Sequence, residues 1–215
     1  MALRINEIFY SIQGESSYAG RPCVFIRLTG CNLRCSFCDT RYAYHGGDEM
    51  DVGEIVDLTR SYNCSLVEIT GGEPLIQKDT PYLVEALLQH GFRVLMETNG
   101  SLNISMVDSR CVRIIDIKCP SSGEDAKNDL ENLKRLTDKD QIKFVIGERE
   151  DYSFAKEILQ TSGIRPFESN PVYFSPVFDK MDPKFLANWI LEDHLNVAIQ
   201  LQYHKIIWGP GRRGV

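Results

Sequence analysis

Short apolar runs alternate with amphipathic stretches along most of the chain. The apolar and β-branched runs predict seven strands, at residues 23–29, 65–70, 92–98, 112–118, 141–147, 171–176 and 196–202. The amphipathic stretches between them predict helices at residues 51–62, 80–90, 127–136, 151–162 and 183–194. Strands that alternate with helices in this way are typical of βα units and a mostly parallel sheet.

Residues that favour helix ends stand where this pattern requires them. Acidic or hydroxyl side chains precede or open four of the predicted helices, and glycines follow two of them. The expected N-caps are Asp51, Thr80, Asp151 and Asp182, and the expected exits are Gly91 and Gly163.

The predicted fold class is therefore α/β, with mostly parallel strands that close into an incomplete (β/α) barrel. A complete eightfold barrel takes about 250 residues, whereas this chain has 215 residues. A flat, doubly wound sheet is the alternative architecture. A hydrophobic content of 43% is enough for one sizeable core, so we expect a single domain over residues 1–215.

The least ordinary segments follow the predicted strands. "TGCNLRC", "GGEP", "TNG" and "KCPSSG" come directly after the first four strands. In parallel α/β folds the functional site lies beyond the carboxyl ends of the strands. We therefore expect these segments to meet in one site.

Charge and hydropathy narrow the class of protein. A net charge of −6 argues against a nucleic-acid partner, because binding to phosphates requires a basic face. No apolar run is long enough for a signal peptide or a bilayer span, so we expect a cytoplasmic protein without a membrane partner. Seven cysteines in a reducing compartment favour metal or redox chemistry over disulfides.

Three of those cysteines, Cys31, Cys35 and Cys38, lie within eight residues. At this cysteine frequency, such spacing has a chance probability of about one percent or less. A structural zinc site requires four closed ligands, and no second cysteine pair supplies them, although the single residues Cys64, Cys111 and Cys119 each offer one thiol. Three thiolates on an iron–sulfur cubane would leave one iron open to a ligand that is not protein.

"CNLRCSFC" resembles the CxxxCxxC motif of radical S-adenosylmethionine (SAM) enzymes, whose fold is a partial or full (β/α) barrel. The resemblance implies a 4Fe–4S cluster on Cys31, Cys35 and Cys38 whose open iron chelates SAM. One-electron reduction then releases a 5′-deoxyadenosyl radical, so that the radical arises on the cofactor and protein residues position the reactants and exclude water. "TGGEP" at residues 70–74 resembles the family's GGE motif, which binds the amino group of the methionine part of SAM.

"EIFYSIQGESSYAGRPCVFIRLTGCNLRC" resembles the N-terminal region of the 7-carboxy-7-deazaguanine synthase family, and "CDT", "ETNG", "IDIK", "KFV", "FSP" and "LQYHK" extend the resemblance along the chain. It implies a lyase that contracts 6-carboxy-5,6,7,8-tetrahydropterin to 7-carboxy-7-deazaguanine with release of ammonia, in queuosine and deazapurine biosynthesis. The reaction begins with removal of hydrogen from C6, and return of that hydrogen regenerates SAM.

The resemblance also implies roles for individual residues. Thr40 ligates a Mg²⁺ ion that holds the substrate carboxylate. Substrate contacts are Ile12, Gln13, Gly14, Glu15, Arg27 and Thr70. SAM contacts are Phe37, Asp39, Gly72, Glu97, Asn99, Asp116, Lys118, Ser175, Pro176, Val177 and Phe178.

Residue type alone leaves plainer interpretations open. Residues 13–15 read as a solvated turn, Arg27 as a strand-end salt bridge and Thr40 as a helix or turn cap. Asp116 and Lys118 read as strand-end charges, and a lone histidine after a strand, such as His204, is more often structural. The chain continues past Pro210 with "GRRGV". The sequence leaves open whether this C-terminal segment helps to close the substrate pocket.

Two other functions share some of these features. A glycyl-radical enzyme activating enzyme has the cysteine motif and a GGE-like loop, and an iron–sulfur electron carrier has the cluster. Neither requires "YSIQGE" or "CDT". For the synthase we expect a pterin substrate, a flavodoxin- or ferredoxin-like electron donor and a homodimer.

Overall fold

A computed structural model describes all 215 residues of the chain. The strands are β1 (Ala2–Ile12), β2 (Pro22–Leu28), β3 (Asp48–Asp51), β4 (Leu66–Gly71), β5 (Arg93–Thr98), β6 (Val112–Ile117), β7 (Gln141–Ile146), β8 (Val172–Pro176) and β9 (Ala198–Ile199). The α-helices are α1 (Val52–Ser61), α2 (Thr80–Gln89), α3 (Arg149–Ser162), α4 (Pro183–Glu192) and α5 (Tyr203–Trp208).

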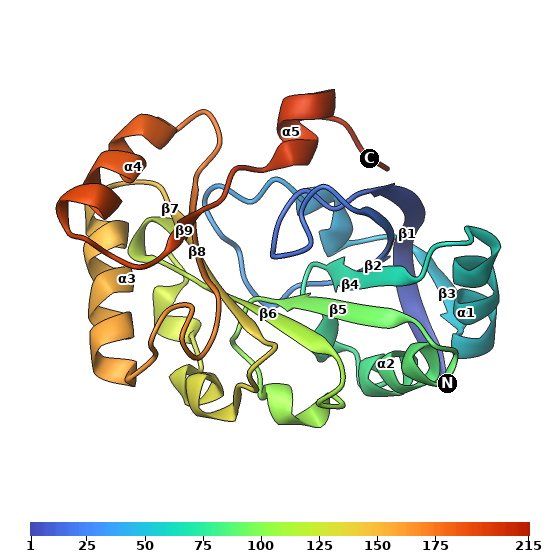
Figure 1. Cartoon of the computed structure of the whole chain (residues 1–215). Helices are drawn as coiled ribbons and strands as arrows, with labels where there is room; N and C mark the ends of the chain where they lie inside the picture. The colour runs from blue at the N-terminus through green and yellow to red at the C-terminus, as the bar shows by residue number, and fades with distance from the viewer.

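All nine strands form one sheet in the order β3-β1-β2-β4-β5-β6-β7-β8-β9. From β2 onward every neighbouring pair is parallel and the strands follow one another in chain order, whereas β1 is antiparallel to both β2 and β3. A doubly wound sheet would reverse its strand order at a switch point, and this sheet has no such reversal. The expected mostly parallel, open barrel is confirmed (Figure 1).

The two faces of the sheet differ in chemistry because side chains alternate along each strand. On β4, Val67 and Ile69 belong to a core cluster of 33 buried residues that also takes in the helices. Glu68 and Thr70, which alternate with them, point to the opposite, concave face and line a cavity there. The helices α1 to α4 cover the outside of the curved sheet (Figure 1). The inner face is therefore free to carry polar side chains.

Most predicted elements and two predicted caps are confirmed. Asp51 caps α1 by accepting from the Gly53 amide at 2.9 Å, while the Glu54 carboxylate accepts from the Asp51 amide at 2.9 Å. Asp182 caps α4 by accepting from the Lys184 amide at 2.9 Å. Gly91 and Gly163 have φ of +82° and +72°, the left-handed conformation that ends helices.

Three local predictions are wrong. Residues 127–136 form two 3₁₀ segments, Asp125–Lys127 and Leu130–Arg135, instead of an α-helix. The Asn132 amide group donates to the carbonyls of Gly100 and Leu102, and such side-chain bonds to backbone compete with helical ones. The Thr80 hydroxyl donates to the Pro74 carbonyl instead of capping α2. Helix α3 begins at Arg149, two residues before Asp151, so Asp151 is not its N-cap.

The ends of the chain were the least predictable part. Strands β1 and β3 and the short helix α5 were not predicted, and the strand expected at 196–202 is only Ala198–Ile199. Strand β1 forms its bonds to β2 and β3, which lie 10 and 36 residues further along the chain. Its polar residues Asn6, Glu7 and Ser11 obscure the alternation that marks a strand.

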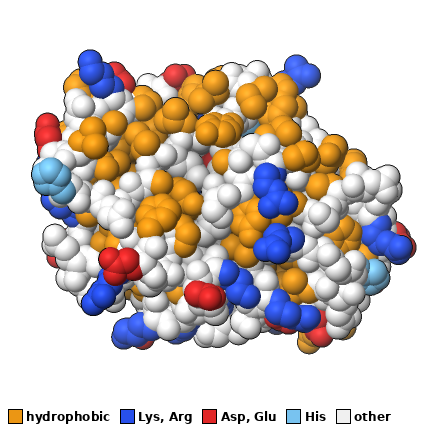
Figure 2. All heavy atoms as spheres, viewed as in Figure 1, with side chains coloured by type: hydrophobic (Ala, Val, Ile, Leu, Met, Phe, Trp, Pro, Cys, Tyr) orange, Lys and Arg blue, Asp and Glu red, His pale blue; other side chains and the backbone are white.

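Helix α5 crosses the top of the sheet (Figure 1) and buries only one residue, Lys205. Its side chains Ile206 and Ile207 are 61% and 56% exposed. Figure 2 shows hydrophobic side chains along the upper edge of this face of the molecule. Helix α5 is thus held by polar contacts rather than by apolar packing. No helix of the structure combines the length and the apolar character that crossing a membrane demands.

Candidate active site

A cavity of about 640 Å³ lies on the concave face of the sheet, at the carboxyl ends of the strands. Its size lies within the range of small-molecule sites. It brings together the segments that follow the first four predicted strands, as expected. The predicted residues that line it are Ile12, Gln13, Gly14, Glu15, Arg27, Cys31, Cys35, Phe37, Cys38, Asp39, Thr40, Thr70, Gly72, Glu97, Asn99, Asp116, Lys118, Val177 and Phe178. Ser175 and Pro176 do not line it.

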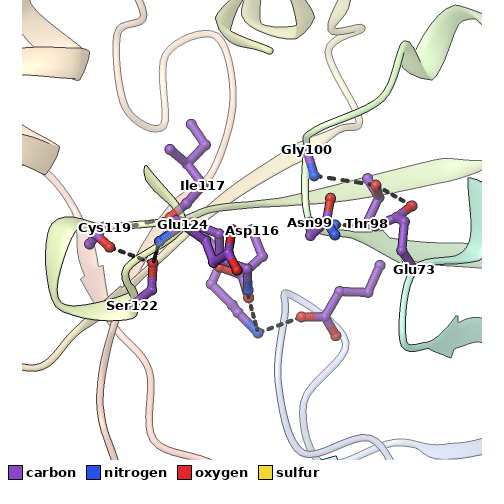
Figure 3. Close-up of polar contacts among 12 residues, drawn as sticks. Glu73, Thr98, Asn99, Gly100, Asp116, Ile117, Cys119, Ser122 and Glu124 are labelled. Atoms are coloured by element: carbon purple, nitrogen blue, oxygen red, sulfur yellow. Dashed lines mark hydrogen bonds and ion pairs between the residues drawn. The ribbon is translucent and has the colours of Figure 1, made fainter. Parts of the chain in front are cut away.

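The loop after β2 carries the three cysteines of the motif to the cavity wall. This loop has no regular structure, and the segment after β6 holds it in place. The Ser36 amide donates to the Ser122 carbonyl at 3.0 Å, and the Arg34 amide donates to Glu124 Oε1 at 2.6 Å. Ser122 and Glu124 lie together at the end of β6 (Figure 3). The thiols are thus presented on an ordered loop.

The cysteine chemistry suits an iron–sulfur cluster better than a single ion. No three His, Cys, Asp or Glu side chains lie close enough to hold one metal ion. Three thiolates on a soft metal cluster instead each bind a different iron, and thiolates are the ligands that iron–sulfur clusters select. Burial raises the pKa of the Cys31 and Cys35 thiols, so a positively charged metal centre is needed to hold them as thiolates. The chain has no disulfide.

The glycine-rich loop after β4 packs directly against the cysteine loop. A Cβ atom at Gly72 would collide with the Gly30 carbonyl and with Cys31 Cβ, so only glycine permits this approach. Glu73 is fully buried and accepts from Thr98 Oγ1 at 2.8 Å and from the Asn99 amide at 2.6 Å (Figure 3). Glu73 therefore joins the ends of β4 and β5 beneath the cysteines.

Arg27 is both a salt-bridge partner and a cavity residue. Its Nε lies 2.7 Å from Glu7 Oε1, the same oxygen that accepts from the Tyr42 hydroxyl at 2.8 Å. The Arg27 guanidinium lies over the Tyr42 ring at 5.8 Å, and Arg213 from the C-terminal segment lies over it at 3.9 Å. The cavity wall here carries two guanidinium groups around one aromatic ring.

A buried ionic network crosses the inner face of the sheet. Lys143 Nζ on β7 lies 2.8 Å from Glu15, 2.5 Å from Glu97 and 3.7 Å from Asp116. Burial alone would lower the pKa of Lys143, but Glu15 and the other carboxylates outweigh burial and raise it. Lys118 Nζ lies 2.8 Å from Asp116 Oδ2. The other carboxylate oxygen of Asp116, Oδ1, is buried without a hydrogen-bond partner. Both lysines are therefore charged.

The segment after β1 meets the segment before α5 across the cavity. The Tyr203 amide donates to the Gly14 carbonyl at 3.1 Å, and Gln202 Nε2 donates to Glu15 Oε1 at 2.8 Å. A Cβ atom at Gly14 would collide with the His204 ring, which also lines the cavity. These contacts close the gap that an open barrel leaves between its first and last strands.

The C-terminal residues also lie in the site. Pro210 and residues 212–215 line the cavity, so the "GRRGV" extension forms part of its wall. The C-terminal segment therefore helps to enclose the cavity, which the sequence alone did not decide.

Thr40 precedes a 3₁₀ helix, Arg41–Tyr44, but its side chain makes no capping bond to that helix. The hydroxyl donates instead to Asp39 Oδ1 at 2.8 Å, and Asp39 Oδ2 lies 2.5 Å from Lys205 Nζ on α5. Thr40 lines the cavity, and its hydroxyl does not cap the helix that follows.

Several cavity residues were not predicted from the sequence. Most are charged or aromatic side chains on strands or in the C-terminal segment: Phe9, Phe25, Tyr42, Tyr44, Glu68, Lys143, Gln202, Lys205, Arg212 and Arg213. Glu68 in "LVEIT" and Lys143 in "QIKFV" each interrupt an apolar strand. A charged residue at the inward position of such a strand is the signal that would have found them.

Comparisons with known proteins agree with this geometry. Residues 25–114 match the model of the radical SAM superfamily. The chain is 46% identical to 7-carboxy-7-deazaguanine synthase of Koribacter versatilis, over 99% of this chain and 100% of the relative. It is 44% identical to the synthase of Chlorobaculum tepidum, over 99% and 97%. The crystal structure of QueE from Escherichia coli superposes with a TM-score of 0.78 at 22% identity, covering 94% of each chain.

Proposed function

The chain belongs to the 7-carboxy-7-deazaguanine synthase family of radical SAM enzymes, and we propose that it converts 6-carboxy-5,6,7,8-tetrahydropterin to 7-carboxy-7-deazaguanine with release of ammonia. The observation that carries the proposal is a single cavity in which three cysteine thiols, three guanidinium groups and a buried ionic network meet. Because the chain is 46% identical to a synthase along its whole length, the activating-enzyme and electron-carrier alternatives have no support.

Radical SAM enzymes contain a 4Fe–4S cluster and SAM. Cys31, Cys35 and Cys38 are the thiols that would hold the cluster, because one loop brings all three to the cavity wall. When bound, the cluster and SAM supply the one-electron chemistry that removes hydrogen from the substrate. The protein's own residues hold the reactants in place and exclude water.

Two groups of residues are proposed to hold SAM. Phe37 and Asp39 would do so from the cysteine loop, and Val177 and Phe178 from the end of β8. The residues proposed from the carboxyl ends of β4, β5 and β6 and from the loops that follow them are Gly72, Glu97, Asn99, Asp116 and Lys118. Asp116 Oδ1 accepts no hydrogen bond within the protein and is enclosed by it, so Asp116 would face SAM through the remainder of its side chain. Ser175 and Pro176 lie behind the cavity wall and would act by supporting Val177.

The substrate is proposed to lie against the segment Ile12–Glu15, Arg27 and Thr70. The Arg27 guanidinium is proposed to bind the substrate carboxylate, because a guanidinium donates paired hydrogen bonds to a carboxylate. Burial raises the pKa of Glu15, but Lys143, His204 and Gln202 together outweigh burial and lower it to about 2, so Glu15 is ionised. An ionised carboxylate accepts hydrogen bonds from the N–H groups of a pterin ring.

Mg²⁺ is proposed to bind at Thr40. The hydroxyl is free of a capping bond and lies beside Asp39, whose charge Lys205 offsets. One protein hydroxyl makes a weak site by itself, so substrate oxygens and water must complete the octahedron. Magnesium binding then depends on substrate.

The partners follow from this chemistry. A flavodoxin- or ferredoxin-like protein would supply the electron, and the product would enter queuosine or other deazapurine biosynthesis. A homodimer is the assembly we propose for the chain.

An anaerobic assay tests the function. Reconstituted protein, SAM, a reductant and 6-carboxytetrahydropterin should yield 7-carboxy-7-deazaguanine and ammonia in equal amounts. Cys31→Ala should lose the cluster and all turnover, whereas Cys111→Ala, at a buried thiol outside the cavity, should keep about four irons per chain. Absence of product from cluster-loaded wild-type protein would reject the proposal.

A further inference from the structure

Glu68 is a buried carboxyl group on β4 that none of the roles above uses. Its side chain is on the inner face of the sheet, and the residue is only 4% exposed. Phe25 on β2 and Leu95 on β5 pair with it in register on either side, and both are buried. Glu68 therefore lies on the apolar part of the cavity floor.

The two carboxyl oxygens of Glu68 have different surroundings. Oε2 accepts a hydrogen bond from Gln13 Nε2, and the Gln13 Oε1 atom in turn accepts from the Glu15 amide at 3.1 Å. Oε1 accepts no hydrogen bond from the protein and is not enclosed by it, so it faces the cavity. One oxygen is thus fixed by the substrate-binding segment, and the other is presented to a ligand.

No cation contacts Glu68 directly, and the charge of Lys143 lowers the pKa of Glu68 by less than burial and the neighbouring carboxylates raise it. Lys143, on β7, contacts Glu15, Glu97 and Asp116 but not Glu68. The other titratable groups that face Glu68 are Glu15 after β1, Glu97 on β5 and Cys23 on β2. Burial raises the pKa of the Cys23 thiol strongly, so Cys23 supplies no charge either.

A buried carboxylate without a cation is costly, and the group takes up a proton instead. Burial, followed by repulsion from Glu97 and Glu15, raises the pKa of Glu68 to about 8. Since Oε2 accepts from the Gln13 amide, Oε2 is the carbonyl oxygen of the neutral acid, and the proton is on Oε1. The O–H group then points into the cavity.

We propose that Glu68 is a substrate-recognition residue that, as a neutral carboxylic acid, donates a hydrogen bond from Oε1 to an acceptor atom of the pterin-type heterocycle on the cavity floor. This inference rests on the proposed function. A carboxylic acid held neutral in an apolar site is an effective hydrogen-bond donor at neutral pH. The same oxygen as a carboxylate would repel a ring nitrogen or carbonyl oxygen.

Two substitutions separate the neutral acid from the carboxylate. Glu68→Gln keeps an acceptor for Gln13 and places an N–H donor at the position of Oε1, whereas Glu68→Leu keeps the volume and removes both groups. The probe is 6-carboxypterin, an unreactive fluorescent analogue, titrated into cluster-loaded protein with SAM and without reductant.

At pH 7 we expect Glu68→Gln to bind the probe within about threefold of the wild type and Glu68→Leu to bind about tenfold more weakly or worse. Between pH 7 and 9.5 the wild type should lose about tenfold more affinity than Glu68→Gln, which also corrects for ionisation of the probe. Wild-type affinity in Glu68→Leu would overturn the inference. So would Glu68→Gln binding as weakly as Glu68→Leu, because the charged form would then be the one that binds.

Unfolding in urea provides a readout that needs no substrate. A raised native pKa contributes stability that is complete below the ordinary pKa near 4.5 and is lost as the pH rises towards 8. The wild type should therefore lose stability relative to Glu68→Gln over this interval, and parallel profiles would overturn the inference. Failure of the proposed function is distinct, since it appears as absent turnover of 6-carboxytetrahydropterin by the wild type.

Discussion

At the scale of single residues, Thr40 shows how position changes the meaning of a side chain. Threonine before a helix ordinarily caps it, yet the Thr40 hydroxyl donates to Asp39 and makes no bond to a helix amide. Lys205 compensates the Asp39 charge at 2.5 Å. Thr40 thus lines the cavity with a hydroxyl that is bonded to Asp39 and does not cap the helix.

Thr40→Val should therefore abolish the coupling between magnesium and substrate. In the wild type, added Mg²⁺ should tighten binding of 6-carboxypterin, and the probe should raise Mg²⁺ affinity by the same factor, because linkage is reciprocal. Thr40→Val removes the oxygen and keeps the shape, so its probe affinity should not respond to Mg²⁺. Fluorescence titration with and without Mg²⁺ measures both effects.

Thr40→Ser is the matched control, since it keeps a hydroxyl and should retain part of the response. If Thr40 were a cap, Thr40→Val would instead lose about 0.5–2 kcal/mol of stability with its magnesium response intact. Equal magnesium effects in the wild type and Thr40→Val would exclude Thr40 as the ligand.

At the scale of elements, the buried pair Arg113–Asp140 joins β6 to the turn that leads into β7. Arg113 is 3% exposed and Asp140 is fully buried, with 2.5 Å between Nη2 and Oδ2. Asp140 also accepts from the Arg113 amide at 2.8 Å and from the Thr137 amide at 2.6 Å. One carboxylate thus satisfies donors from strand β6 and from the connection that leads into β7.

Asp140→Ala should lower the free energy of unfolding by about 3–5 kcal/mol, because it leaves the Arg113 charge buried without a partner. The exposed pair Lys134–Glu131, with side chains 74% and 61% exposed, is the internal comparison. Glu131→Ala should cost about 1 kcal/mol or less. Urea unfolding of the two variants measures the difference, and similar losses would contradict the account.

At the scale of the whole molecule, the cavity wall joins residues from both ends of the chain. Glu15 bonds Lys143 and Gln202, which are 128 and 187 residues away in sequence. The barrel is open between its edge strands, and the Glu15–Gln202 contact joins the segments that follow β1 and β9. A ligand in the cavity should therefore stabilise both ends together.

Saturating 6-carboxypterin, at about 100 times its dissociation constant, should raise the free energy of unfolding by about 2.7 kcal/mol. Amide hydrogen exchange should slow in residues 13–16 and 202–205 together, because the Gly14 carbonyl and Glu15 carboxylate bond the second segment directly. Slowing in only one of these segments would show that the two walls respond independently.

Local chemistry was enough to predict much of this molecule. Helices α1 and α4 were located from periodicity and from their caps Asp51 and Asp182, since a cap acts within three residues of itself. The cysteine loop and the glycine loop were placed at one end of a parallel sheet because the carboxyl ends of parallel strands share an edge. The open barrel followed from the alternation of strands and helices.

Periodicity, caps and motifs thus predict the central strands, most of the helices and the loops that reach the site, but not β1, β3, α5 or the inward side chains Glu68 and Lys143. Only the tertiary structure decided what those side chains meet: Lys143 with Glu15, Glu68 with Gln13, and Arg213 over Tyr42. These pairs are far apart along the chain, so no local periodicity encodes them. The charge states of Glu68 and Lys143 depend on burial and on neighbours from other strands, which exist only after the sheet has formed.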